Sequence, residues 1–499
     1  MSPVPRPPSP PSAATRHLTH EYNRQIQTLL STLHSTLGPE TVYSPGSDGY
    51  ASSNASYFAQ QQSQLRPVAV VSPTCAADVA EIIRLLASAQ DQDGNPVRLA
   101  IRSGGHAVDA GAANADGGVT IDLSRLNSIH VSEDRKTVSI GPGAKWGQVY
   151  DKLDAIGLSV AGCRSAPVGV GGLTLGGGIS YFSPRFGWTC DTVTNFQVVL
   201  ADGAIVNANE KENEDLVIAL RGGSHNFGVV TRFDFAAFEQ AQIWGGSLFH
   251  NLDTVDDNLT AFQDFASAED YDEYASLITS FGFAAGRGAG IVNSVEYTKP
   301  AESLPVFEPF LQIPNVMSTM RLAGMGEISR EQAVYSPYGL RQFSLQTTHG
   351  PNLELLKTVF SCWKTSISVV EDVANIVWSI SLEPLPAIFY KRAGTANSLG
   401  LSDRNKPLVI TLLTAMWTDE ADDAKVEKTA RKMLVDIETK AKELGEYDPF
   451  VYVNYAAPWQ DPIASYGRES IERLKKVRER VDPKGVFTHR VTGAFKLPA

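Results

Sequence analysis

The chain has 499 residues, of which 43% are hydrophobic and 20% charged, a composition typical of a globular protein with more than one buried core. Its formal net charge is −12 and it has no block of five or more Lys or Arg residues, so a nucleic-acid partner, which needs a basic face, is not expected. No run of about 18 apolar residues exists, so no membrane-spanning segment is expected.

The first 20 residues are rich in proline and predict a disordered or polyproline lead-in. They lack the basic stretch followed by an apolar core that marks a secretory signal, so a cytoplasmic location is expected, with secretion by another route left open. The four cysteines, Cys75, Cys163, Cys190 and Cys362, form no CxxC pair. We therefore expect no metal site and reduced thiols, although two could pair if the chain were exported.

Hydrophobic spacing predicts a β-α-β start to the first domain. A helix is expected within residues 20–35, a strand over 66–73 and a helix over 74–90, with Thr74 as its N-cap and Asp78 in its first turn. The next strand, 97–102, leads into the turn Ser103–His106. Further strands are expected at 118–123 and 137–143, and a hairpin with an Asp-Gly turn over 196–206.

From about residue 240 the pattern changes. Strand-like runs such as 376–382 and 408–417 alternate with helices such as 422–444, which predicts an α+β domain with an antiparallel sheet. We divide the chain into a first domain over 40–240, a second domain over 241–448 and a C-terminal segment, 449–499, that returns to the first domain. The tail contains a basic helix stopped by Asp482-Pro483.

Glycine clusters in three turns, each beside a strand: Ser103–His106, the long segment 160–193 and the segment 221–233. Backbone without Cβ atoms can approach a ligand closely, and its N–H groups can cradle a diphosphate. A Rossmann fingerprint fails because Thr174 stands where the last glycine is needed. The P-loop and the Gly-x-Ser-x-Gly elbow are absent too. A lone loop histidine such as His106 is usually an ordinary surface or core side chain.

Five segments in order change that interpretation: RSGGH (102–106), VGVGGLTLGGGISYFSPRFG (168–187), RGGSHNFGVVTRF (221–233), YVNYAAPWQDPIASYG (452–467) and RVDPKGVF (480–487). Together they resemble the berberine-bridge-enzyme-like FAD-linked oxidases of the vanillyl-alcohol-oxidase superfamily, especially fungal members. The resemblance runs from about residue 40 to the C-terminus. It implies an α+β fold with two domains. The first, over 40–240, is a two-lobed FAD-binding domain of the p-cresol-methylhydroxylase type, and the second, over 241–448, is an α+β substrate domain.

The resemblance implies that His106 is bonded covalently to the 8α-methyl group of FAD, and that the amides of Ser103–Gly105 cradle the diphosphate. Some relatives use a second link from a cysteine, but Ser165 occupies that position and Cys163 lies two residues farther away. A single covalent link is therefore expected. The FAD-binding residues that the resemblance implies are His106, Arg102, Ser103, Gly104, Gly105, Gly169, Gly171, Gly172, Gly176, Gly177, Gly178, Asp191, Gly228, Val230 and Asn454.

Three residues receive catalytic roles by the same resemblance. Tyr455 is the expected base, which requires its pKa to be depressed from about 10. The strand positions at which plant relatives carry a polar helper are apolar here, Ile410 or Leu412, so Glu383 is the substitute. Val168 is expected to leave room for oxygen beside the flavin.

The implied activity is a covalent-FAD oxidase. It removes a hydride from a small organic substrate, most naturally a secondary metabolite, and passes the electrons to oxygen, giving hydrogen peroxide. An FAD-linked dehydrogenase, a carbohydrate oxidase and a catalytically idle flavin-binding protein remain alternatives. The expected partners are a small molecule and oxygen, with no obligate protein partner.

Overall fold

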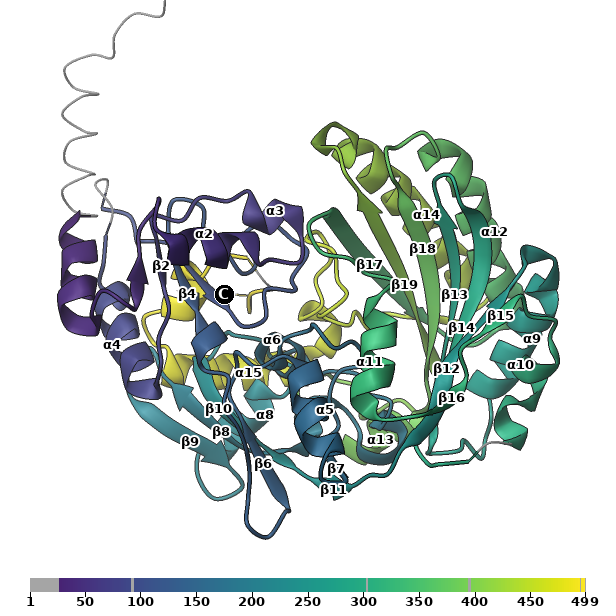
Figure 1. The fold of residues 1–499 in the computed structure, drawn as a ribbon, viewed down its shortest axis with the longest axis horizontal. Coiled ribbons are helices and arrows are strands. Elements are labelled where there is room, and N and C mark those ends of the chain that lie inside the picture. The colour runs from purple at the N-terminus through teal and green to yellow at the C-terminus, as the bar shows by residue number, and fades with distance from the viewer. Residues whose placement is uncertain (1–26, 91–93, 302–303, 394–395, 494, 499) are drawn as a thin grey trace, which may run out of the picture.

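The computed structural model describes residues 27–90, 94–301, 304–393, 396–493 and 495–498. Figure 1 shows two lobes side by side, one formed by the N-terminal half and the other by residues from about 243 to 448. The predicted lead-in, residues 1–20, lies outside the described residues. The domain boundaries stay predictions, but the α+β architecture with an antiparallel sheet is confirmed.

The N-terminal lobe holds two sheets. In the first, three strands run parallel and a fourth pairs antiparallel at one edge, in the order β1 (Val42–Tyr43), β2 (Ala69–Val71), β4 (Val119–Asp122), β3 (Leu99–Arg102). The second is antiparallel, in the order β5 (Ile129–Val131), β6 (Thr137–Ile140), β10 (Val229–Ala236), β8 (Val193–Val199), β9 (Ile205–Asn209). A short ribbon pairs β7 (Leu158–Ser159) with β11 (Phe238–Glu239).

The predicted β-α-β start is confirmed, with β2 and β3 on either side of β4 and the helix α4 (Ala76–Ala87) between β2 and β3 in sequence. Its apolar face, Val79, Ile82, Ile83 and Leu86, is buried. The predicted cap is wrong. Cys75 is the N-cap, and the Thr74 hydroxyl donates instead to the Asp78 carboxylate at 2.8 Å. A first-turn aspartate one turn away competes for the threonine hydroxyl, which moves the helix start by one residue.

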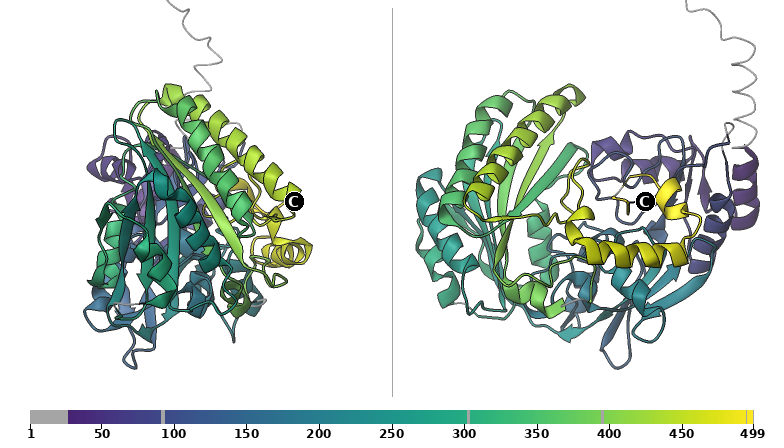
Figure 2. Two further views of the ribbon diagram at one scale, coloured as in Figure 1. Left: turned by 90° about the vertical axis from the view of Figure 1, so that its right-hand side faces the viewer. Right: turned by 180° about the vertical axis from the view of Figure 1, so that it is seen from behind.

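The predicted hairpin is also confirmed, with β8 and β9 joined through the Asp202-Gly203 turn. Other helices of this lobe are α2 (Asp48–Ala55), α3 (Gln60–Ser63), α5 (Trp146–Asp154), α6 (Val170–Leu175), α7 (Ser183–Phe186) and α8 (Glu214–Leu220). The C-terminal helix α15 (Arg468–Val481) returns to this lobe (Figure 2), and Val491 beyond it bridges Leu99 of β3.

The second lobe is built on an antiparallel sheet of nine strands within the described residues. Their order is β15 (Met317–Ser318), β12 (Ile243–His250), β14 (Gly288–Tyr297), β13 (Ala275–Ala284), β18 (Val377–Leu385), β19 (Leu408–Trp417), β17 (Arg341–His349), β20 (Tyr447–Asp448), and β16 (Arg321–Ala323) pairs with β12. Its remaining helices are α9 (Val255–Ala266), α10 (Glu308–Gln312), α11 (Met325–Ala333), α12 (Leu353–Val370), α13 (Ala387–Ala393) and α14 (Asp423–Glu443).

Side-chain alternation along β18 shows how the two faces of this sheet differ. Trp378, Ile380 and Leu382 pack into the core formed with α9, α12 and α14, which cover the outer face (Figures 1 and 2). Ser381 and Glu383 therefore point to the opposite face, towards the first lobe, because successive strand residues alternate. The strand pattern thus places polar groups at the seam between the lobes.

Candidate active site

The turn after β3 is built by a close approach of two glycine backbones. A Cβ atom on Gly104 would lie 2.6 Å from both Cα and N of Gly169. The two backbone segments cross here so closely that neither could carry a side chain at this crossing. Ser103 fastens the crossing: its hydroxyl donates to the Pro142 carbonyl at 2.5 Å and accepts from the Gly171 N–H at 3.1 Å. Gly105 follows at φ +68°, a left-handed conformation that glycine adopts without strain.

His106 leaves this turn between two aromatic rings. Its imidazole is stacked on Phe58, with ring centroids 3.9 Å apart and planes 11° apart, and Tyr338 meets it edge-on at 5.9 Å. Burial, with a smaller contribution from the Lys145 ammonium, lowers the pKa of His106 to about 4. The imidazole is therefore neutral at physiological pH, which a nucleophile requires.

The Nε2 atom of His106 is buried and has no hydrogen-bond partner among the described residues. A buried polar atom without a partner is uncommon and calls for an explanation. An imidazole nitrogen that bonds covalently to a cofactor would supply one, so this side chain fits the FAD attachment that the sequence predicts.

The second glycine segment contains α6 and the turn that follows it. Gly176 lies under the Asn454 side chain, whose Oδ1 would be only 2.0 Å from a Cβ atom there. Asn454 donates to the Leu173 carbonyl at 3.0 Å, and the Gly178 N–H donates to the Tyr452 hydroxyl at 3.0 Å. The C-terminal segment thus packs against the glycine segment, and the predicted role of Asn454 in binding FAD stays a prediction.

Gly172 differs from these glycines. It is exposed, and a Cβ atom on it would meet no described atom within 4 Å. Internal packing therefore does not require glycine at this position, whereas a cofactor lying against the backbone would. Gly177, at φ +109°, packs under Trp188 and Tyr452 instead. The open space over Gly172 and the unpartnered His106 nitrogen both fit FAD.

Three polar side chains meet at the seam between the lobes. The Tyr455 hydroxyl lies 3.3 Å from each carboxylate oxygen of Glu383. Arg164 donates to the Tyr455 oxygen at 2.6 Å and to Glu383 at 2.7 Å. Glu383 and Arg164 are only 5% and 8% exposed, so this ion pair acts in a largely dry environment.

Glu383 stays the predicted substitute for the missing helper. It lies on β18 directly opposite Ile410 of β19, one of the apolar positions at which a polar residue was expected. The electrostatic expectation for Tyr455 is wrong, however. Burial raises its pKa well above the ordinary value, and the Arg164 charge opposes this only in part. Tyr455 is therefore a protonated phenol near neutral pH.

Several other predicted residues make contacts that hold the fold. The Arg102 guanidinium binds Ser53, Ser56 and Asp122, and lies 4.0 Å from the Tyr57 ring centroid. Asp191 accepts hydrogen bonds from the Trp188 N–H and the Asn397 amide. Gly228 packs against β8, and Val230 is buried in the core. Their roles towards FAD stay predictions.

Val168 and Cys163 lie on either side of the Arg164 loop. Val168 is half-buried, and its carbonyl accepts from the Trp146 N–H at 3.0 Å, next to the Gly104–Gly169 crossing. Cys163 is in the core, where burial raises the pKa of its thiol to about 11 and its sulfur accepts from the Ser165 N–H at 3.4 Å. A buried neutral thiol is a poor nucleophile, which supports a single FAD link.

Sequence reasoning missed Arg164, Phe58 and Tyr338. One signal was available for Arg164: it is the only charged residue between Ile156 and Pro184. A lone charge in a glycine-rich, apolar segment needs a buried partner. Phe58 and Tyr338 carry no comparable signal, because nothing in their local sequence connects them with His106.

Neither a membrane-spanning helix nor a metal site is found among the described residues. No helix among them is long and apolar enough to cross a membrane. No group of three or more His, Cys, Asp or Glu side chains in this part of the chain is placed to hold a metal ion. All four cysteines are free thiols in the structure.

Comparisons with known proteins show the family and the fold of the chain. Residues 67–209 match the FAD binding domain family and residues 451–491 the family described as "Berberine and berberine like". The FAD-dependent monooxygenase CTB5 of Cercospora beticola is 35% identical over 93% of this chain and 91% of its own length. The oligopeptidase PhomG' of Diaporthe leptostromiformis is 41% identical over 94% of this chain, which spans only 37% of that longer protein.

Among solved structures, the xylooligosaccharide oxidase of Myceliophthora thermophila, in complex with xylobiose, has the same fold. Its TM-score is 0.77 at 21% identity, with 95% of this chain and 100% of that chain covered. The paired FAD-binding and C-terminal family matches, the full-length fungal relative and the shared fold lead to one conclusion. The chain belongs to the berberine-bridge-enzyme-like family of FAD-linked oxidoreductases.

Proposed function

We propose that this enzyme is a covalent-FAD oxidase of a small organic substrate in which Tyr455 and Glu383 together take a proton from a substrate O–H or N–H. The observation that carries the proposal is the position of the Tyr455 hydroxyl, in hydrogen-bond contact with both Arg164 and Glu383. A phenol placed between a cation and a carboxylate at the seam of the two lobes is suited to proton transfer.

The raised pKa of Tyr455 determines how the transfer proceeds. A protonated phenol cannot accept a proton until it loses its own. The substrate proton therefore passes to the Tyr455 oxygen as the phenolic proton moves to the Glu383 carboxylate. One proton leaves the substrate and one arrives at Glu383, so the charge is balanced. Arg164 stabilises the negative charge that passes through the Tyr455 oxygen.

The residues that would hold FAD are those of the glycine-built wall: His106 as the covalent link, the Ser103–Gly105 turn at the diphosphate, and Gly172 beneath the cofactor. The chemistry that FAD supplies when bound is acceptance of a hydride from the substrate carbon and delivery of the electrons to oxygen, which leaves as hydrogen peroxide. The neutral imidazole of His106 is the nucleophile for attachment.

The opposite wall at the seam between the lobes is the inner face of the nine-stranded sheet. Ser280 and Ser381 share a 2.7 Å hydrogen bond on adjacent strands of this face. Ser294 donates to the buried Glu296 at 2.6 Å, and burial raises the pKa of Glu296 to about 8. Such a polar wall favours a substrate with hydroxyl or amine groups.

The test begins with a screen of hydrogen peroxide release against a panel of metabolites, with product masses. With a substrate found, Tyr455→Phe should lower the rate of anaerobic flavin reduction by about 10²-fold or more, because the proton path is cut while the ring remains. Glu383→Gln, which keeps the shape but accepts no proton, should lower it by a similar factor.

Tyr466→Phe is the matched control, since it removes one buried hydroxyl that donates to the Gly222 carbonyl instead. It should reduce normally. A loss below threefold in Tyr455→Phe contradicts the proposal. A large loss in Tyr455→Phe with none in Glu383→Gln would show that Tyr455 acts alone as the base.

A further inference from the structure

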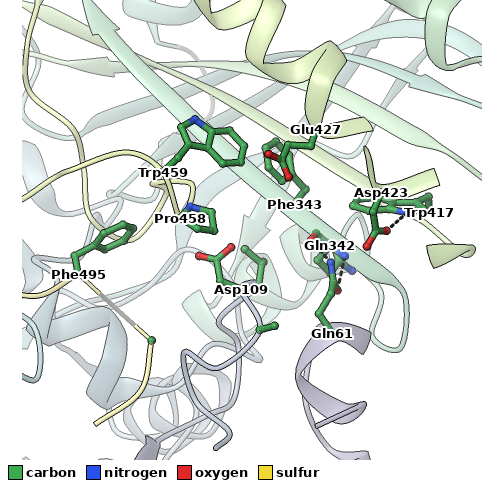
Figure 3. Close-up of a pocket in the computed structure, with 13 residues that line it drawn as sticks. Gln61, Asp109, Gln342, Phe343, Trp417, Asp423, Glu427, Pro458, Trp459 and Phe495 are labelled. Carbon is green, nitrogen blue, oxygen red and sulfur yellow. Dashed lines mark hydrogen bonds between the residues drawn. The ribbon is translucent and has the colours of Figure 1, made fainter. Parts of the chain in front are cut away.

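A pocket of about 400 Å³ lies at the seam between the lobes, beside the residues described above (Figure 3). Asp109 and Pro458 line it, three residues after His106 and Tyr455 respectively. Three residues span at most about 11 Å of extended chain, so the lining of the pocket begins within that distance of the predicted FAD link and of the predicted proton relay. Its volume suits a small organic molecule.

The charged groups that line this pocket are all acidic. They are Asp109 from the FAD-binding lobe and Asp423 and Glu427 from α14, and no Lys, Arg or His is among the described lining residues. Two of the three acids have partners: Arg341 binds Asp423, and Arg431 donates to Glu427 at 2.8 Å.

Asp109 is the exception. Its carboxylate makes no hydrogen bond or ion pair with any described residue, and it points into the pocket in Figure 3. Burial alone raises its pKa to about 7. The side chain is half-buried and its carboxylate has no partner, so a ligand that brings a positive charge would supply the missing ion pair.

The remaining walls are aromatic. Phe343, Trp417, Trp459 and Phe495 line the pocket around Asp109 (Figure 3). Arg431 lies 3.3 Å from the Trp459 ring centroid, and Phe343 stacks on the same ring. Trp459 thus already carries a cation, and the aromatic walls offer apolar contact to the carbon skeleton of an organic ammonium ion, whose charge would pair with Asp109.

The aromatic lining is poorly suited to a sugar. A sugar stacks on an open aromatic face, whereas Trp459 is covered by both Phe343 and Arg431. The Gln61 and Gln342 amides are partly used, because Gln61 bonds to the backbone of Gln342 and Gln342 donates to the Pro337 carbonyl, which leaves one N–H on each amide. The charged groups of the lining are carboxylates, whose oxygens only accept hydrogen bonds when ionised.

We propose that this pocket binds an organic ammonium ion, with Asp109 as its charge partner and the aromatic walls around its carbon skeleton. The proposal rests on the proposed function only in making this ion the charged end of the substrate. The binding site itself is tested without turnover.

The test uses the flavin-loaded enzyme and isothermal titration calorimetry at pH 8 and low salt. The probes are 2-phenylethylammonium and 2-phenylethanol, which differ chiefly in charge. We expect the ammonium to bind at least tenfold more tightly. Asp109→Asn should abolish this difference and leave the affinity for the alcohol unchanged. Asp257→Asn, a matched change at an exposed position on α9, should behave as wild type.

The pH dependence gives a second measurement. The probe keeps its charge between pH 6 and 8, while the Asp109 carboxyl loses its proton, so affinity should rise about tenfold across this range. Asp423 and Glu427 are the other titratable groups that line the pocket, and both are held by arginines. Asp109→Asn should remove the rise.

Several results would overturn the proposal: no measurable binding of the ammonium, equal affinity for both probes, or unchanged ammonium binding in Asp109→Asn. Cellobiose binding that is lost in Asp109→Asn would assign the pocket to a carbohydrate. The same titration of Tyr455→Phe separates the two proposals, because that variant should bind the ammonium normally although its turnover fails.

Discussion

The two walls of the cleft between the lobes are built by different means. On the FAD-binding side, Gly104 and Gly169 are in backbone contact, and no described atom lies near the place of a Cβ atom on Gly172, so backbone atoms rather than side chains form this wall. On the sheet side, Glu383 projects from a strand and meets Arg164 and Tyr455 from distant segments. The first wall is suited to holding a cofactor against backbone, and the second to moving a proton.

The largest expected effect concerns His106, whose side chain projects from the glycine-built wall. His106→Ala should lose all acid-stable flavin, because the neutral, unpartnered Nε2 atom is the only nucleophile that we assign to this wall. The measurement is the flavin absorbance that remains with the protein after it has been denatured and precipitated in acid. Cys163→Ser should keep its flavin bond. Flavin retained by denatured His106→Ala would instead make Cys163 a second link.

A smaller effect separates internal packing from cofactor contact within the same wall. Gly104→Ala should destabilise the flavin-free protein by about 1–3 kcal/mol, because the new methyl group would lie 2.6 Å from the Gly169 backbone. Gly172→Ala should leave the flavin-free protein as stable or up to about 1 kcal/mol more stable, since it places alanine within a helix.

Thermal unfolding of both variants without flavin, followed by flavin titration, makes the measurement. We expect Gly172→Ala to bind flavin less well although its fold is intact. Normal flavin binding by Gly172→Ala would place the cofactor elsewhere, and an unchanged melting temperature for Gly104→Ala would mean that the crossing relaxes easily.

The difference between the two walls also explains what the sequence could and could not predict. The glycines of the turn around His106 predict a close approach, and the structure brings Gly104 against the Gly169 backbone, while the approach of a ligand to this turn stays a prediction. Consecutive glycines mark such a turn in the local sequence, although they do not identify the segment that it contacts. Helix α4 was likewise predicted from local periodicity. The N-cap of this helix was not, because the Thr74 hydroxyl can bond either to a backbone N–H at the start of the helix or, as in the structure, to the Asp78 carboxylate.

The sheet side depends on contacts between distant residues. Arg164 and Glu383 are separated by 219 positions, and their ion pair forms only when the lobes pack together. The sequence suggested Glu383 because a helper was missing, but the pKa of Tyr455 depends on burial that no local pattern records. Phe58 and Tyr338 around His106 belong to the same class.

The smallest expected effect is at Val168, where the glycine-built wall carries a side chain beside the Gly104–Gly169 crossing. Val168→Leu adds one methylene, which is enough to close a space of diatomic size in an interior packed near crystal density. Anaerobic reduction by substrate should change less than twofold. Return of the yellow absorbance on mixing with oxygen should slow at least tenfold in stopped-flow measurements, with turnover shifting towards artificial acceptors.

The control is Val316→Leu, because Val316 is 64% exposed and the added methylene meets solvent. Normal reoxidation of Val168→Leu would show that Val168 only packs the turn against the core, with which it is already in contact. If the wild-type enzyme itself returns slowly to yellow in air but rapidly with a quinone, the electron acceptor is not oxygen. The enzyme would then be a dehydrogenase, with the same proton relay on the sheet side, because the two walls act on different steps.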